Sequence, residues 1–486
     1  MILAVAFGVC VLSTLYWLFI RTSKGKSLNA CCVSKAHLTC DPGDRKRGYN
    51  NVVCIVRFTE ILKAEEFWHE FEKTIVARES AFRRCMRFVF GAMSWEDPEP
   101  DWSPRDNFNI VREQIDGIRL EELSGELLGS YIDLTKPCWH LTFYESVTRI
   151  NWGAPSTVIM LKYHHAMADG FTMIQNMIGK IKPVAADRTL ESLFPRIRPA
   201  TIQNRSILQN ACSFASSAVR ILIKKPDAPG VFRDHTSRRA DDRLSVALGR
   251  SLTLSRFKNI ARLASAKLGI ENISVNDVVT AIFSIAFRMH AIRTNPKSIP
   301  GDISTVVWVS LSKELSFLAS DSVREWDNSN LGFAYCQMPL SESNSLESLR
   351  LCHKRLDKLK SSADAVVINT ALKLIGSLPV EIGKAVSAVS ADTASVSMSN
   401  LPGPNAPVYW PVGDDQATDH SGLVEELYFI SSPPFHLGPL VSIISYCGEL
   451  FGSLSARESV LSRKDLSQII NEDLSIAITS LENSLS

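Results

Sequence analysis

The sequence predicts a two-domain α/β protein with mixed sheets. Its 486 residues exceed what a single hydrophobic core usually organises. Strand-like and helix-like apolar patterns alternate in both halves of the chain, which is typical of α/β folds. A stretch with two prolines, a glycine and dense charge, residues 224–245, separates the halves. We therefore expect an N-terminal domain over residues 45–190, a crossover linker over 191–245 and a C-terminal domain over 246–486.

The composition describes an ordinary globular protein, with 45% hydrophobic and 21% charged residues. The net charge of +2 and the lack of a basic stripe interleaved with aromatic residues argue against a nucleic-acid partner. The eleven cysteines are odd in number and include no C-x-x-C pair, which argues against a disulfide framework and against a zinc site. Such cysteine usage suits a reducing compartment.

The N-terminal segment predicts a membrane anchor. Residues 2–20 carry no charge, and as a helix they would span about 28 Å, close to the thickness of the hydrocarbon core. Arg21, Lys24 and Lys26 follow directly, so the positive-inside bias places the rest of the chain in the cytosol. We expect residues 1–26 to be a single transmembrane helix with its basic flank, in the endoplasmic reticulum or alternatively in the plasma membrane. A cleaved signal peptide is the competing interpretation.

The N-terminal domain alternates strand and helix patterns. The apolar side chains of Phe67, Phe71 and Ile75 are spaced for one helical face. The expected elements are a strand at 52–58, a helix at 64–79, a strand at 156–163 and a helix at 171–181.

The linker contains an apolar run, residues 206–223, that fits either a core helix or a helix on a membrane surface. We expect it to pack in a core. In the C-terminal domain, Ser274 is a candidate cap for a helix over 274–292. The strand-like runs that follow are 304–311, 331–340, 394–399, 423–430, and a hairpin of 440–447 with 450–455 that turns at Gly448-Glu449.

Two adjacent histidines stand where the strand at 156–163 ends, and Asp169-Gly170 follows them. Neighbouring side chains of a strand point to opposite faces, so His164 and His165 cannot both approach one atom if the strand continues. A neutral imidazole is the commonest general base, and an alcohol attacking a thioester needs one. Asp169 fits as an orienting group for an imidazole, as a helix cap or as an ion-pair partner. The alternatives are two core histidines followed by a cap, or a metal site that lacks a third ligand nearby.

The pattern resembles a known family. His164 to Gly170 are similar to the HHxxxDG signature of the chloramphenicol-acetyltransferase-like superfamily. Residues 137–139 (PCW), 276–277 (ND) and 399–404 (SNLPGP) resemble the PLW, Asn-Asp and SNVPGP motifs of the wax ester synthase/diacylglycerol acyltransferase family. Their order and spacing agree from about residue 50 to the C-terminus. The opening motif of the bacterial enzymes is not recognisable, and an apolar run stands in its place, which indicates a eukaryotic, membrane-anchored branch.

The resemblance implies a chloramphenicol-acetyltransferase-like fold with a tunnel between its lobes. It also implies an O-acyltransferase that makes wax esters or triacylglycerol from acyl-CoA and a fatty alcohol or diacylglycerol. His165 would be the general base in a ternary complex. His164 and Asp169 would orient the loop, and Asn276 is our candidate donor to the oxyanion. Neither a cofactor nor a metal is expected.

Gly170, Pro137 and Trp139 are the expected substrate-binding residues. Pro137 and Trp139 fit equally well as residues that shape a strand entry and fill the core, and Asn276 fits a structural role in a first helical turn. Two other functions stay open: acyl transfer to a different hydroxyl or amine acceptor, and a membrane-tethered lipid-binding protein without turnover.

Overall fold

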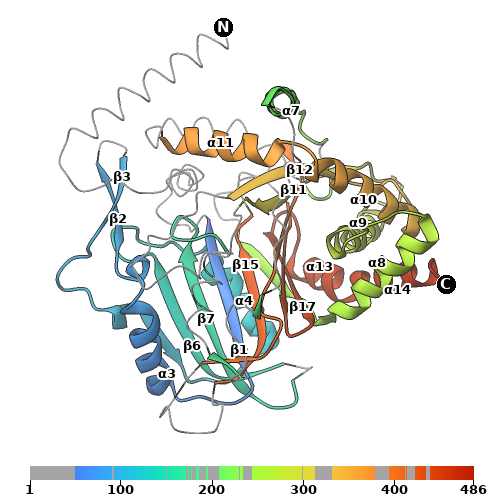
Figure 1. The fold of residues 1–486 in the computed structure, drawn as a ribbon. Coiled ribbons are helices and arrows are strands. Elements are labelled where there is room, and N and C mark those ends of the chain that lie inside the picture. Colours follow the sequence, from blue (N-terminus) through green and yellow to red (C-terminus); the bar gives the residue numbers. More distant parts are fainter. Residues whose placement is uncertain are drawn as a thin grey trace.

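The computed structural model describes residues 50–89, 92–149, 152–170, 173, 177, 182–184, 193–194, 207–228, 230–233, 243–297, 299–311, 331–377, 393–410, 412, 422–433 and 438–486. The predicted α/β class with mixed sheets is confirmed, and two large sheets form two lobes (Figure 1). The expected anchor, residues 1–26, lies outside the described residues. So do most residues of the helix expected at 171–181, although Gly170, Met173 and Met177 are helical.

The N-terminal sheet has six strands in the order β15-β1-β7-β6-β4, with β5 beside β6. Its central strand β7 is buried along its whole length, which explains its continuous apolar run. The helix α3 (Ala64–Phe71) begins where it was expected, and it packs its aromatic side chains into the same core. The strands are β1 (Asn51–Phe58), β4 (Phe108–Val111), β5 (Ile115–Asp116), β6 (Trp139–Thr148), β7 (Ser156–His164) and β15 (Val424–Ser431).

The C-terminal sheet has seven strands and is mixed, since β13 runs parallel to both of its neighbours and the other pairs are antiparallel. Helices gather on one face of it, at the right of Figure 1. The strands are β9 (Leu244–Leu248), β10 (Leu252–Thr253), β11 (Ile303–Ser310), β12 (Leu331–Met338), β13 (Val396–Leu401), β16 (Leu440–Tyr446) and β17 (Glu449–Arg457). The helices are α8 (Leu254–Leu268), α9 (Val275–Thr294), α10 (Ser345–Lys360), α13 (Arg463–Gln468) and α14 (Leu474–Asn483).

The long helix α9 begins at its predicted cap. The Ser274 side chain accepts a hydrogen bond from the Asp277 backbone, and the Asp277 carboxylate accepts one from the Ser274 backbone. Within the described residues α9 is the one helix long and apolar enough to cross a membrane, but 67% of its apolar window is buried in the C-terminal core. It is therefore a core helix of this lobe.

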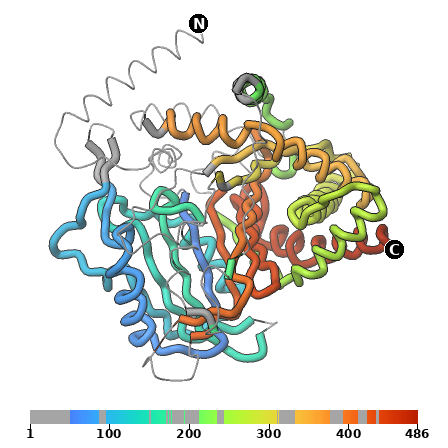
Figure 2. The backbone as a smooth tube through the Cα atoms, in the orientation of Figure 1, coloured from blue at the N-terminus to red at the C-terminus, as the bar shows by residue number. Residues whose placement is uncertain are grey.

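One strand from the C-terminal half of the sequence joins the sheet of the N-terminal lobe. β15 comes from the C-terminal half of the sequence, yet it pairs with β1 at the edge of the N-terminal sheet, so that red and blue segments run side by side in Figure 2. The helix α4 (Gly117–Gly129) also joins the lobes, because Gly125 approaches the backbone of β9 so closely that an added Cβ would lie 2.3 Å from the Leu244 carbonyl oxygen. The predicted domain boundaries remain a prediction, but the sheets are not confined to them.

Two local expectations are corrected. The apolar run at 206–223 forms α7 (Ile207–Leu222), and most of its described side chains are exposed, so the expectation of a core helix is wrong. The hairpin between β16 and β17 turns at Cys447 and Gly448, which have φ of 50° and 82°, rather than at Gly448-Glu449. Two consecutive positive φ values match the twist of a two-residue hairpin.

Candidate active site

The histidine pair stands on a tight turn that closes β7. His164 is the last strand residue and pairs with Asn51 of β1, while its backbone N–H donates to the Cys138 carbonyl at 3.0 Å. The next residue leaves the strand, since the His165 N–H donates to the Asn50 carbonyl at 2.7 Å. The Met167 N–H then closes the turn on the His164 carbonyl at 2.9 Å. The strand therefore does not continue through both histidines, and their rings occupy different environments.

The His164 ring is buried and forms a hydrogen bond within its own turn. It is 2% exposed, and its Nδ1 accepts a hydrogen bond from the Ala166 N–H at 3.1 Å. Burial, with contributions from His165 and Lys162, lowers the pKa of His164 to about 3. The ring is thus neutral near pH 7, with its proton on Nε2. A ring that holds the turn in this way fits the orienting role expected for His164.

The Asp169 charge acts on the His165 ring. Burial lowers the pKa of His165, and the negative charge of Asp169 opposes that shift. The ring is therefore neutral near pH 7, as a general base must be, and the Asp169 charge favours the imidazolium that forms when the ring takes a proton. Asp169 is itself 8% exposed, and its carbonyl accepts from the Met173 N–H at the start of the following helix.

Sequence reasoning missed Tyr163, the residue before the pair. Its side chain is fully buried, and its pKa is raised well above the ordinary value by burial, with the Cys54 thiol and the Asp169 carboxylate as further causes. The Asp169 charge therefore acts on Tyr163 as well as on His165. Strand alternation could not have suggested it, because β7 ends at His164 and His165 lies in the turn.

Gly170 connects the histidine turn to the C-terminal lobe. A Cβ at this position would lie 2.9 Å from Leu401 Cδ1, at the end of β13. The preceding residue, Asn400, donates from its side-chain amide to Asn276 Oδ1 at 2.5 Å. The structure thus brings the SNLPGP segment, the Asn-Asp segment and the HHxxxDG turn to one place, although they lie far apart in the sequence.

The amide pair Asn276 and Asn400 is exposed, at the N-terminal end of α9. A helix N-terminus favours negative charge, and Asn276 accepts through its oxygen. Among the described residues, none receives a hydrogen bond from the Asn276 amide nitrogen, so its N–H groups are free to donate to a substrate oxygen. Asn400 is a second candidate donor that the sequence did not single out.

Asp277 has a different role from its neighbour. It is fully buried, it caps α9, and its carboxylate lies 3.0 Å from His353 Nδ1 and 3.6 Å from Lys360 Nζ on α10. A buried carboxylate that contacts one backbone N–H, one imidazole and one ammonium group is structural. The Asn-Asp motif therefore combines one accessible amide with one buried anchor.

Trp139 lies in the core of the N-terminal lobe. Its ring is fully buried, Nε1 donates to the Phe82 carbonyl at 2.8 Å, and the ring packs against those of Phe71 and Phe82. The buried Pro137 accepts from Asn107 Nδ2 at 3.1 Å. Both residues are therefore buried in the protein, and the substrate-binding role expected for them stays a prediction.

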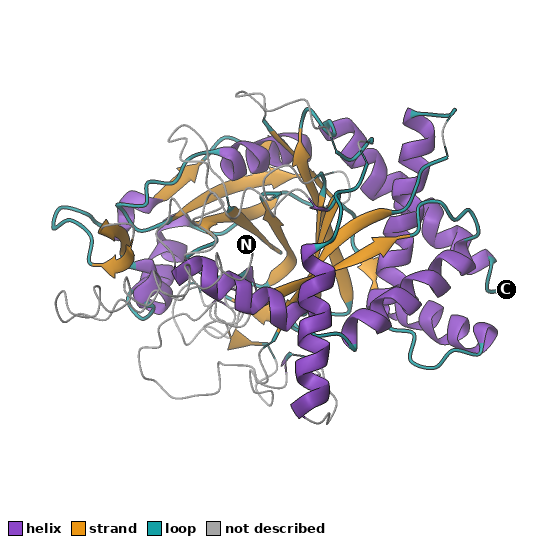
Figure 3. Ribbon diagram, turned by 90° about the horizontal axis from the view of Figure 1, so that it is seen from above, coloured by secondary structure: helices purple, strands orange, loops and turns teal. Residues whose placement is uncertain are grey.

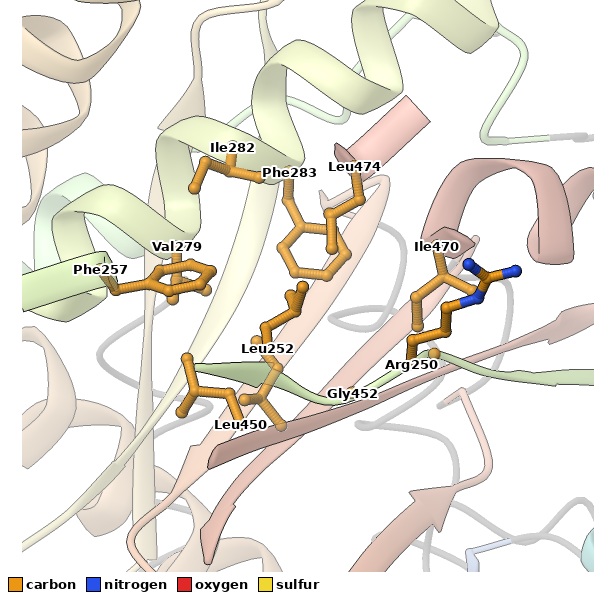
Figure 4. Close-up of a pocket in the computed structure, with 12 residues that line it drawn as sticks. Arg250, Leu252, Phe257, Val279, Ile282, Phe283, Leu450, Gly452, Ile470 and Leu474 are labelled. Carbon is orange, nitrogen blue, oxygen red and sulfur yellow. The ribbon is translucent and has the colours of Figure 1, made fainter. Parts of the chain in front are cut away.

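A narrow apolar cavity lies elsewhere, inside the C-terminal lobe. Figure 4 shows Phe257 and Val279 at one end of it and Arg250 at the opposite end. Its lining from α8, α9, β16, β17 and α14 holds neither a histidine nor a carboxylate. Its lining therefore offers no general base for acyl transfer.

Comparisons with known proteins agree with this geometry. Residues 326–476 match the family described as the WS/DGAT C-terminal domain. A probable diacylglycerol O-acyltransferase, tgs1, of Mycobacterium tuberculosis is 23% identical over 397 residues, which cover 78% of this chain and 79% of the relative. A second, putative diacylglycerol O-acyltransferase of that species, Rv0895, is 22% identical over 71% of this chain and 68% of the relative.

Solved structures share the fold. A wax ester synthase/diacylglycerol acyltransferase from Marinobacter aquaeolei VT8 superposes with a TM-score of 0.60 at 15% identity, over 93% of this chain and 98% of the other. The first condensation domain of the calcium-dependent antibiotic synthetase reaches 0.56 at 12% identity, over 93% and 95%. The predicted chloramphenicol-acetyltransferase-like fold is thus confirmed. The two mycobacterial relatives and the Marinobacter enzyme are bacterial, so they give the expected eukaryotic branch no support.

Proposed function

We infer that this chain is an O-acyltransferase of the wax ester synthase/diacylglycerol acyltransferase family, which joins an acyl group to a fatty alcohol or diacylglycerol. The observation that carries this conclusion is the neutral His165, on a turn whose Gly170 lies close to Leu401, the residue next to the exposed pair Asn400 and Asn276. In this proposal His165 supplies the base and the amides supply hydrogen-bond donors, which is what ester formation from a thioester requires.

The proposed step needs no acyl-enzyme. With acyl-CoA and acceptor bound together, His165 removes the hydroxyl proton as the oxygen attacks the thioester carbonyl. The negative charge that develops on the carbonyl oxygen receives hydrogen bonds from Asn276 or Asn400. The C–S bond then breaks, and the CoA sulfur takes the proton back from His165. Atoms balance as one ester and one free CoA.

The test is to give the purified full-length protein one isotope-labelled long-chain acyl-CoA with a mixture of fatty alcohol, diacylglycerol, sterol and small amine. Mass spectrometry identifies which product carries the label. Labelled wax ester or triacylglycerol supports the proposal. Labelled sterol ester or amide alone would show that the acceptor is a sterol or an amine instead of a fatty alcohol or diacylglycerol. Binding of acyl-CoA without any product would favour a lipid-binding protein without turnover.

The protein works at a membrane in this proposal. Its acceptors dissolve in bilayers, and the uncharged run of residues 2–20 with Arg21, Lys24 and Lys26 supports an anchor that leaves both lobes in the cytosol, on the endoplasmic reticulum or the plasma membrane. Protease digestion of intact microsomes tests the orientation. Degradation of the lobes supports it, and their protection would place them in the lumen.

A further inference from the structure

The described part of α7 carries a concentration of exposed apolar side chains. Phe214, Val219, Leu222 and the next residue, Ile223, are 38%, 56%, 78% and 70% exposed, and together we call them the α7 stripe. Single exposed hydrophobic residues are normal on a protein surface, but four within ten residues of one helix are not.

The opposite side of α7 is polar and faces the protein. Ser217 is 1% exposed, and Arg220 forms an ion pair with Asp364 at the start of α11 (Asp364–Ser377). Just beyond the helix, Lys224 Nζ donates to Ser304 Oγ at 2.8 Å and to the Thr393 carbonyl at 2.6 Å. A surface helix of a soluble protein normally turns its apolar face inward. These contacts fix α7 with its apolar stripe turned outward.

The neighbouring helix extends this surface. α11 packs beside α7, and its Leu374 is 53% exposed. Figure 1 shows both helices at the upper edge of the molecule, where α11 also packs on β12, and Figure 3 looks down on that edge. α11 therefore adds one exposed apolar side chain at this edge of the molecule.

The charge of this segment identifies its partner. Residues 207–225 contain no acidic residue, and of their three basic residues Lys225 is exposed, Arg220 keeps 47% of its side chain exposed beside Asp364, and Lys224 is held by the protein. An apolar helix face with basic residues along its border and no acidic ones is typical of helices that lie in the interface of an anionic bilayer. We propose that the α7 stripe docks the protein on an anionic lipid surface, as a contact separate from residues 2–20. The docking rests on the proposed function only in that it would bring the active site to acceptors dissolved in the bilayer.

The first test measures backbone hydrogen exchange of the full-length protein alone, with phosphatidylcholine vesicles, and with vesicles that also contain phosphatidylglycerol. We expect exchange across residues 207–225 to slow by about tenfold or more with the anionic vesicles. Equal exchange in all three samples would overturn the proposal. Protection that rises with protein concentration in the absence of vesicles would do so too, because a second copy would then cover the stripe.

The second test compares two double variants. Val219→Asp with Leu222→Asp places charge in the stripe, whereas Ile61→Asp with Ile299→Asp changes side chains of matching exposure, 57% and 78%, outside it. The stripe variant should lose the vesicle-induced protection and make about tenfold less ester from a vesicle-embedded alcohol. Both variants should match the parent with a short, soluble alcohol. Equal behaviour of the two variants on vesicles contradicts the docking. Inactivity of the parent with every acceptor refutes the proposed function, and the exchange measurement then still decides the docking.

Discussion

At the scale of single residues, the two histidines differ because burial acts on each of them in a different setting. Nδ1 of His164 accepts a hydrogen bond from the Ala166 N–H, whereas the charge of Asp169 opposes the lowering of the His165 pKa. The sequence indicated that the two rings could not serve one atom together. It could not indicate which ring is sealed, since that depends on where β7 ends and on the contacts of the turn with Cys138 and Asn50.

The pH dependence of activity follows from the lowered pKa of His165. Because the neutral ring is the active form, kcat/KM should stay level as pH falls to the ordinary histidine value near 6.5 and should decline only below it. Initial rates in overlapping buffers give the profile. A decline centred above pH 6.5 would contradict the account.

A melting curve at each pH is the control for that profile. The buried His164 has a folded-state pKa of about 3, below its unfolded value, so the unfolded chain binds the extra proton first. Its contribution to stability is complete above pH 6.5 and is lost as the pH falls toward 3. Rates are compared only where the protein remains folded.

Replacement of Asp169 tests whether its carboxylate holds the histidine turn in shape or takes part in the reaction directly. In Asp169→Asn the buried carboxylate loses the charge that acts on His165 and Tyr163, and we expect a loss of about 1–3 kcal/mol in the free energy of unfolding together with lower activity. Urea unfolding and kcat measure the two effects. Unchanged stability with lost turnover would instead assign Asp169 a direct catalytic part.

At the scale of elements, α9 shows which features could be predicted locally. Its start was predictable because Ser274 and Asp277 form a capping box within four residues. The exposed face of α7 was not, because apolar content does not say whether another element covers a helix. The amide pair Asn276 and Asn400 was also hidden, since it joins a helix to a strand 124 residues away.

Substitutions at the two residues of the Asn-Asp motif should have different effects on stability and on activity. Asn276→Ala removes an exposed amide, so stability should change by less than about 0.5 kcal/mol. If the amide binds the oxyanion, kcat should fall by about 10²–10³. Asp277→Asn removes a buried charge that faces His353 and Lys360, and it should destabilise the protein by about 1–3 kcal/mol. Thermal melts and initial rates decide, and a fully active Asn276→Ala would remove Asn276 from the mechanism.

At the scale of the whole molecule, β15 and α4 connect the two lobes. Neither connection could be predicted from the sequence. Strand patterns predict that a segment is a strand, but they do not predict the sheet that a long-range strand joins. The alternation of elements was enough for the fold class. The membership of β15 in the N-terminal sheet is seen only from its pairing with β1.

Two glycines of α4 test how closely the lobes must meet. Alanine normally favours a helix over glycine by about 1 kcal/mol. At Gly125 the added Cβ would meet the Leu244 carbonyl oxygen at 2.3 Å, whereas at Gly129 the nearest atoms of Leu244 are 3.8 Å away. We expect Gly125→Ala to lose about 1–3 kcal/mol in the free energy of unfolding and part of its activity. Gly129→Ala should melt at or above the parent temperature, and equal melting of the two variants would show that the contact is not tight.

The most direct test of the central claim is a rapid-quench time course with labelled long-chain acyl-CoA and a fatty alcohol, run on the parent, His164→Ala and His165→Ala. The account predicts that the parent releases one CoA for each ester formed and that no label remains on the protein. It predicts that His165→Ala keeps the melting temperature of the parent but forms ester about 10²–10⁴-fold more slowly, with a smaller loss for His164→Ala. Ester formation by His165→Ala at the parent rate, or an acyl group bound covalently to the parent, would contradict it.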